Sequence, residues 1–181
     1  MNIVLIGYRC SGKTTVGKLL AQDLGREFVD TDRLMEEKAG LTIHAYVSQK
    51  GWKHFRELES DVVKGVATRD NLVIATGGGV VMDQDNVRNL RKNGWFVWLK
   101  TKPSVIRDRM NREDKSGELR PSLSRMDPLE EIDQILQGRT PFYERTGDYT
   151  VDTNGQLPEE VVQAIMKTFS VRDKNRIPGD Y

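Results

Sequence analysis

Gly7-Tyr8-Arg9-Cys10-Ser11-Gly12-Lys13-Thr14 is the stretch of this sequence that decides the fold. It fits the phosphate-binding loop pattern of a glycine, four further residues, then Gly, Lys and Ser or Thr. The apolar run Ile3-Val4-Leu5-Ile6 directly before it predicts a buried strand, and the apolar residues after it recur at helical spacing: Val16, Leu19, Leu20 and Leu24. A strand, a glycine loop and a helix in this order favour a binding site for ATP or GTP over a chance glycine-rich turn.

The loop has the chemistry that a polyphosphate needs. Its backbone N–H groups and the positive end of the following helix can surround phosphate oxygens. Lys13 is expected to reach the β- and γ-phosphates, and the Thr14 hydroxyl is expected to hold Mg²⁺. The predicted nucleotide-binding residues of this stretch are Gly7, Cys10, Ser11, Gly12, Lys13, Thr14 and Thr15.

Composition narrows the function classes. Charged residues make up 30% of the 181 residues and the formal net charge is +1, which gives no electrostatic case for binding nucleic acid or a membrane. No apolar run could span a bilayer, and the first strand begins at once, so no secretory leader is expected. Cys10 is the one cysteine, which excludes an internal disulfide and fits a reducing compartment. A cytoplasmic enzyme is predicted. A monomer is expected because, once the core is built, no long apolar stripe remains to form an interface with a second copy.

Four further apolar runs predict strands, and helical patterns lie between them. The strands are expected at residues 27–29, 72–75, 95–99 and 149–151, and two amphipathic helices at residues 56–67 and from Pro158 to Phe169. Strands that alternate with helices predict an α/β fold of three layers, α/β/α, with a central five-stranded parallel sheet. Nothing divides the sequence, so residues 1–181 are predicted to form a single domain.

Three segments break this alternation. Leu41 to Lys53 are mixed in character and are expected to form short helices that project from the sheet. Asn111 to Met126 are polar and unpatterned, which favours a charged lid beside the phosphate site over a plain solvated loop. The tail from Ser170 to Tyr181 is polar and is expected to fray.

A second set of residues suggests an acceptor site. Asp30 and Asp32 follow the strand at 27–29, where ligands of open α/β sheets bind, although a helix N-cap and a first-turn acid are equally good interpretations. Thr76-Gly77-Gly78-Gly79 follows another strand and lets backbone approach a ligand closely. Three arginines from separate segments could each bind a carboxylate or phosphate, or form a surface ion pair: Arg56, Arg120 and Arg139.

The combination resembles the shikimate kinase family of P-loop kinases, whose fold is related to that of nucleoside monophosphate kinases. The resemblance runs from Ile3 to about Phe169 and includes the phosphate loop, Phe28 to Asp32, Phe55 to Glu59, Ala75 to Val80, Arg120-Pro121 and Arg139 to Tyr143. It implies ATP-dependent phosphorylation of the 3-hydroxyl of shikimate, giving shikimate 3-phosphate and ADP, in aromatic amino acid (chorismate) biosynthesis. Another small-metabolite kinase, such as a gluconate or nucleotide kinase, and a non-catalytic nucleotide switch are the alternatives.

The resemblance also implies roles for individual residues. Asp32 would accept the proton of the attacking hydroxyl, Arg56 and Arg139 would neutralise the carboxylate, and Glu59 would hold Arg56 in its rotamer. The resemblance implies a shikimate-binding region at about residues 31–60, with further contacts later in the sequence. The implied shikimate-binding residues are Asp32, Phe55, Arg56, Gly77, Gly78, Gly79 and Arg139.

On the nucleotide side, Lys13 and Arg120 would carry the transferring phosphoryl group. Arg109 and the segment from Asp152 to Pro158, including Gln156, would contact the adenine, and Mg²⁺ would be held by Thr14 with Asp30 or Asp32 through water. The sequence departs from the family at Ser122-Leu123, where two leucines are usual, and in a lid lengthened at residues 114–118.

Overall fold

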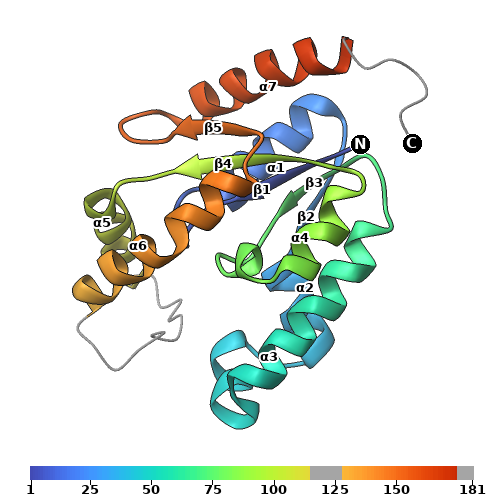
Figure 1. The fold of residues 1–181 in the computed structure, drawn as a ribbon. Coiled ribbons are helices and arrows are strands. Elements are labelled where there is room, and N and C mark those ends of the chain that lie inside the picture. Colours follow the sequence, from blue (N-terminus) through green and yellow to red (C-terminus); the bar gives the residue numbers. More distant parts are fainter. Residues whose placement is uncertain (115–127, 175–181) are drawn as a thin grey trace.

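The computed structural model describes residues 1–114 and 128–174. Within them, five parallel strands form one sheet in the order β2-β3-β1-β4-β5 (Figure 1). The strands are β1 (Asn2–Ile6), β2 (Glu27–Asp30), β3 (Leu72–Ala75), β4 (Gly94–Lys100) and β5 (Tyr149–Asp152). All the pairings are parallel, so the five predicted strands and the predicted sheet type are confirmed.

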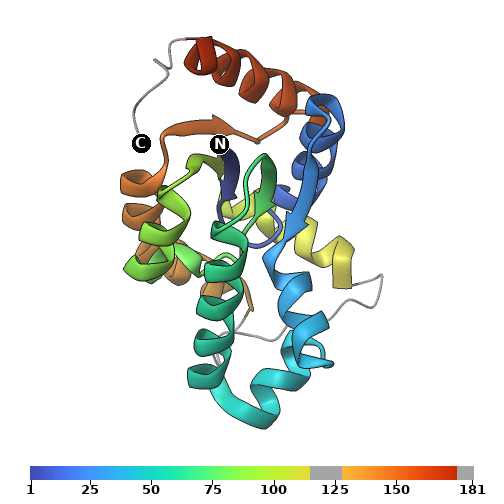
Figure 2. The same cartoon turned by 90° about the vertical axis from the view of Figure 1, so that its right-hand side faces the viewer.

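Helices cover both faces of the sheet, as a parallel sheet requires. Alternate residues of β1 divide the core: Ile3 and Leu5 lie in one apolar cluster with α1 (Lys13–Leu24) and α7 (Pro158–Lys174). Val4 and Ile6 lie in the other cluster, with residues of α2 (Thr31–Ala39), α3 (Ile43–Ala67), α4 (Gln84–Arg91) and α6 (Pro128–Thr146). The three-layer α/β/α prediction is therefore confirmed (Figure 2).

Within the segment from 41 to 53, residues 43–53 are helical, as expected, and form the first part of α3. Thr42 caps this helix by accepting a hydrogen bond from the backbone N–H of Ala45, 3.2 Å away. Gly51 interrupts it with φ 81° and ψ 168°, a conformation that suits glycine and bends the helix. The part of α3 before Gly51 and the end of α2 extend away from the sheet as an arm (Figures 1 and 2).

Two segments differ from the sequence prediction. The helix α5 (Pro103–Asp114) includes residues 111–114, which were assigned to the lid, and the rest of the predicted lid, with Arg120 and Ser122-Leu123, lies outside the described residues. The helix α7 continues to Lys174, so the expected fraying of residues 170–174 is wrong, while 175–181 also lie outside the described residues. A short 3₁₀ turn, η1 (Val80–Met82), follows the glycine loop.

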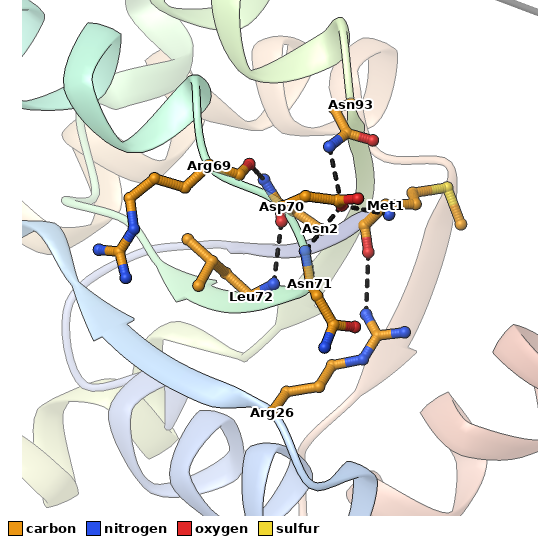
Figure 3. A network of polar contacts seen from close by, with 8 residues as sticks. All are labelled: Met1, Asn2, Arg26, Arg69, Asp70, Asn71, Leu72 and Asn93. Carbon is orange, nitrogen blue, oxygen red and sulfur yellow. Dashed lines mark hydrogen bonds and ion pairs between the residues drawn. The ribbon is translucent and has the colours of Figure 1, made fainter.

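Polar contacts fasten the start of β1 to the turns that flank it (Figure 3). The buried Asn2 side chain accepts a hydrogen bond from the N–H of Leu72 at 2.9 Å and donates to the carbonyl of Arg69 at 2.8 Å. Asp70 binds the Met1 ammonium and accepts from Nδ2 of Asn93 at 2.9 Å. The start of β1 thus joins the turns that precede β3 and β4.

In the described part of the chain, every helix is too short or too polar to cross a bilayer.

Candidate functional site

The phosphate loop leads from β1 into α1. Gly12 is the N-cap of α1 with φ 98°, a backbone conformation that side chains rarely tolerate. Lys13 is 9% exposed, and its Nζ donates to the carbonyls of Gly7 at 2.9 Å and Tyr8 at 2.7 Å. The lysine ammonium therefore lies against the loop that precedes it in sequence.

The other residues predicted for the nucleotide follow the same loop. Ser11 is buried and its hydroxyl lies 3.5 Å from Nζ of Lys13, while Cys10 is half-buried with φ 59°. Thr14 and Thr15 occupy the first turn of α1, where Thr14 is half-buried and Thr15 is exposed.

Asp30 connects this loop to the end of β2. Its Oδ2 accepts a hydrogen bond from Oγ1 of Thr14 at 2.9 Å, and its Oδ1 accepts from the N–H of Asp32 at 3.0 Å. Asp30 is thus the N-cap of α2 and at the same time a neighbour of the phosphate loop, so the two interpretations of this residue are compatible. Asp32 lies in the first turn of α2.

The glycine loop after β3 is tied to its neighbours through threonines. Thr76 donates from its backbone N–H and its hydroxyl to the carbonyl of Leu5, at 3.2 and 3.0 Å. The N–H of Gly77 donates to Oγ1 of the buried Thr31 at 3.0 Å. A methyl group placed on Gly77 would lie 2.7 Å from Oδ1 of Asp32, so this carboxylate lies directly against the loop.

Arg56 lies against the other end of the same loop. A methyl group on Gly79 would lie 2.7 Å from Nη1 of Arg56, and this atom is also 2.7 Å from Oε2 of Glu59. Glu59 is 1% exposed, and burial raises its pKa although the cations of Arg56 and Arg139 oppose the rise. The contact confirms that Glu59 holds Arg56, one helical turn away.

Aromatic side chains pack beside this arginine. The buried ring of Phe55 lies 5.5 Å from that of Trp52 in an edge-to-face arrangement, measured between centroids. The guanidinium of Arg56 lies 5.1 Å from the Phe55 ring centroid and 5.9 Å from that of Trp52. Arg56 therefore has an acid on one side and aromatic faces on the other, which restricts its orientation.

Arg139 reaches the middle of the glycine loop from α6. Its Nη1 donates to the carbonyl of Gly78 at 3.1 Å, and the hydroxyl of Tyr143 donates to the same carbonyl at 2.6 Å. Tyr143 is 1% exposed and stacks on Trp98 with 5.8 Å between the ring centroids. Burial raises the pKa of Tyr143 to about 12, which keeps its hydroxyl protonated.

The residues predicted for the adenine lie on the opposite side of the phosphate loop. Arg109 of α5 donates to the carbonyls of Cys10 at 3.1 Å and Thr153 at 3.3 Å, and so joins the phosphate loop to the end of β5. Gln156 is exposed in the connection from β5 to α7. Arg120, predicted to contact the phosphoryl group, lies outside the described residues.

A cavity of about 330 Å³ lies between the end of β4, the end of β5 and α6. Tyr8 of the phosphate loop lines it together with Trp98, Lys100, Leu136 and Thr140. It does not include Lys13, Asp32 or Arg56. This cavity is therefore next to the predicted reaction site rather than within it.

Two residues of this arrangement had no predicted role. Thr31 stands between the two acids and holds Gly77, and Tyr143 holds Gly78. The sequence places Tyr143 one helical turn after Arg139, which indicates a shared helix face but gives no sign of a common hydrogen-bond acceptor. Both contacts depend on tertiary structure, so spacing alone could not reveal them.

Comparisons with known proteins give a consistent result. A family model for shikimate kinase matches residues 9–170. The shikimate kinase of Thermodesulfovibrio yellowstonii is 40% identical over 168 residues, which cover 93% of this chain and 94% of the relative. The shikimate kinase of Symbiobacterium thermophilum is 42% identical over 172 residues, which cover 95% of this chain and 98% of the relative.

A solved structure agrees with these sequence relatives. The shikimate kinase of Acinetobacter baumannii, in complex with shikimate, superposes with a TM-score of 0.88 at 34% identity. The match covers 97% of this chain and 95% of that chain.

Proposed function

The chain belongs to the shikimate kinase family, and we propose how its residues transfer the γ-phosphoryl group of ATP to the 3-hydroxyl of shikimate. The reaction gives shikimate 3-phosphate and ADP. The observation that carries the assignment of residues is the convergence of Asp32, Arg56 and Arg139 on one loop of three glycines. They come from three different helices, α2, α3 and α6, which makes a chance surface cluster a poor explanation.

The sheet brings this loop beside the phosphate loop. The strands β1 and β3 are neighbours, and Leu5 pairs with Ala75, so the loops that follow both strands leave the same edge. Ligands of open α/β sheets bind at this edge. A hydroxyl bound at the glycine loop would therefore be close to a phosphoryl group bound at the phosphate loop.

On the acceptor side, the two arginines would bind the carboxylate of shikimate and the acid would bind its hydroxyl. Arg56 and Arg139 would bind the shikimate carboxylate through charge-assisted hydrogen bonds, with Glu59 fixing Arg56 and Phe55 packing on the ring. Asp32 would orient the 3-hydroxyl and accept its proton as the oxygen attacks the γ-phosphorus. Gly77, Gly78 and Gly79 would let the ring lie close to backbone.

On the nucleotide side, the backbone of residues 7–15 would surround the phosphates, and Lys13 would move from its carbonyl partners to the β- and γ-phosphate oxygens. Arg120 would bring a second cation to the charge that spreads over the transferring group. Arg109 would stack on the adenine, with Gln156 beside it.

Oxygen ligands for a divalent cation are present next to the phosphate loop. The hydroxyl of Thr14 and the carboxylate of Asp30 lie 2.9 Å apart, and Mg²⁺ prefers a few protein oxygens together with phosphate oxygens and water. These residues fit the metal, with Asp30 better placed than Asp32. When bound, Mg²⁺ would neutralise charge on the β- and γ-phosphates.

The same proposal divides the chain by task. The region at about residues 31–60 would bind shikimate, and residues 111–126 would close as a lid that excludes water from the transferring group. We propose that residues 1–181 act as one domain, as a monomer and in the cytoplasm. The single cysteine of the chain is compatible with a reducing compartment.

The experiment is a measurement of ADP release from MgATP with and without shikimate, with gluconate, quinate and nucleoside monophosphates as alternative acceptors. We expect a large increase with shikimate over a slow basal rate and little with the other acceptors. ATP binding without any shikimate-dependent release would leave the phosphate site in place and contradict the acceptor site.

A further inference from the structure

The carbonyl of Gly78 is the point where two side chains of α6 meet the glycine loop. Tyr143 donates to it from the hydroxyl at 2.6 Å and Arg139 donates from Nη1 at 3.1 Å. A carbonyl oxygen has two lone pairs, and these two donors can occupy both. The shorter of the two hydrogen bonds comes from the neutral side chain.

Tyr143 is held rigidly enough to fix the position of this carbonyl. Its ring is 1% exposed and stacks on Trp98 of β4, with an angle of 19° between the planes. A tyrosine has only two rotatable side-chain bonds, and packing on both sides restricts them. The hydroxyl therefore connects the core of the sheet directly to the backbone of the loop.

Arg139 is half-buried, and its guanidinium interacts directly with the Tyr143 hydroxyl as well as with the loop. Its guanidinium donates to Gly78 and lies 5.8 Å from the ring centroid of Tyr8. A guanidinium has five N–H donors in a fixed plane, so the direction of one hydrogen bond sets the direction of the others. The position of the Gly78 carbonyl thus determines where the remaining donors of Arg139 point.

We propose that Tyr143 is a positioning residue, which fixes the Gly78 carbonyl and through it aligns Arg139 with the carboxylate of the acceptor. This inference rests on the proposed function, in which Arg139 binds that carboxylate. Without the hydroxyl, the carbonyl would have Arg139 as its main donor, and the guanidinium would be drawn toward the loop and away from the acceptor. Tyr143 would touch neither shikimate nor ATP.

The test compares the kinetics of Tyr143→Phe with those of the wild-type enzyme. Loss of one neutral hydrogen bond should raise KM for shikimate by about 3- to 10-fold, while kcat and KM for ATP change less than about twofold. The Tyr143 phenol stays protonated across pH 6–9. The ratio of KM for shikimate in Tyr143→Phe to that in the wild type should therefore be the same throughout that range. Tyr149→Phe removes a hydroxyl from a half-buried tyrosine stacked on Trp95, and should leave all three constants unchanged.

An unchanged KM for shikimate in Tyr143→Phe would overturn the inference. A lower kcat, a higher KM for ATP and a lower melting temperature together would also overturn it, because that pattern indicates general loosening of the core. These outcomes remain measurable because phenylalanine keeps the ring that stacks on Trp98.

A double-mutant cycle with Arg139→Ala separates this inference from the proposed function. Arg139→Ala should raise KM for shikimate by itself, and in that background Tyr143→Phe should add less than about twofold. If Arg139→Ala leaves KM unchanged, the assignment of Arg139 to the carboxylate fails. If Arg139→Ala acts but Tyr143→Phe keeps its full effect beside it, only the alignment through Arg139 fails.

Discussion

Asp30 and Asp32 are separated by one residue, yet their carboxylates have different neighbours. Asp30 accepts from Thr14 and caps α2, which directs it to the phosphate loop, where we propose that it helps to hold Mg²⁺. Asp32 lies against Gly77, which directs it to the glycine loop, where we propose that the acceptor binds. The sequence predicted that both acids follow the same strand, at the edge of the sheet where ligands bind. Which acid lies at the phosphate loop and which at the glycine loop depends on how α2 begins, and the sequence alone does not show this.

Replacement of Asp32 by asparagine should therefore reduce kcat by roughly 10²- to 10⁴-fold, the usual range for the loss of a general base. Asp30→Asn is the matched comparison, and it should mainly raise the Mg²⁺ concentration needed for half-maximal rate. Both are measured by steady-state ADP release at a series of Mg²⁺ concentrations. Wild-type turnover in Asp32→Asn would remove the base assignment.

At the scale of elements, the glycine loop between β3 and η1 is a surface on which three helices place their side chains. The sequence predicted close approach from three consecutive glycines, and the structure shows what approaches: Asp32 at Gly77, Arg139 at Gly78 and Arg56 at Gly79. The individual pairings could not be predicted, because they depend on how α2, α3 and α6 cross the sheet edge.

A methyl group at Gly79 should displace Arg56, because it would lie 2.7 Å from Nη1 and 2.8 Å from Nη2. We expect Gly79→Ala to raise KM for shikimate roughly 10-fold or more, the effect of losing a hydrogen bond to a charged group. Gly65→Ala, on an exposed face of α3 with nothing within 4 Å, is the control.

The control should leave the kinetic constants unchanged and stabilise the fold by about 0.5–1 kcal/mol, because alanine is the better helix former. The two variants are compared by steady-state kinetics and by urea unfolding. An unchanged KM in Gly79→Ala would mean that Arg56 does not need its present position for binding.

For the whole molecule, the sequence predicted the strands, the sheet type and the two-sided cover of helices, because apolar runs between helical patterns specify them locally. The order of the strands and the crossing of α6 over the glycine loop are set by long-range packing, which spacing does not encode. The sequence did not predict that residues 111–114 are helical, because α5 is rich in charged residues and lacks a clear apolar periodicity.

The start of β1 provides a stability test at this scale. Asn2→Ala would leave the buried N–H of Leu72 without its acceptor and should cost about 1–3 kcal/mol of unfolding free energy. Asn93→Ala removes an exposed hydrogen bond to Asp70 and should cost only a few tenths of a kcal/mol, roughly 0.5 kcal/mol at most. Urea unfolding measures both, and equal losses would contradict the bridging role of Asn2.

Asp70 gives the stability a dependence on acid pH. Hydrogen bonds from the Met1 ammonium, Asn93 and the N–H of Asn71 lower the pKa of Asp70 to about 2. Because the folded-state pKa is below the unfolded value, the stabilisation is present above about pH 4 and is lost as pH falls toward 2. The difference in unfolding free energy between the wild type and Asp70→Asn should therefore narrow from pH 5 to pH 2, and a difference that stays constant would contradict this.

The central claim is that the acceptor binds in one orientation, with its carboxylate at Arg56 and Arg139 and its 3-hydroxyl at Asp32 beside the phosphate loop. The most direct measurement is proton–phosphorus correlation NMR on the product formed from shikimate and MgATP. We expect the phosphorus to couple to the proton on carbon 3 alone. Coupling to the protons on carbon 4 or carbon 5 would contradict the proposed orientation, and so would a reaction that yields only inorganic phosphate.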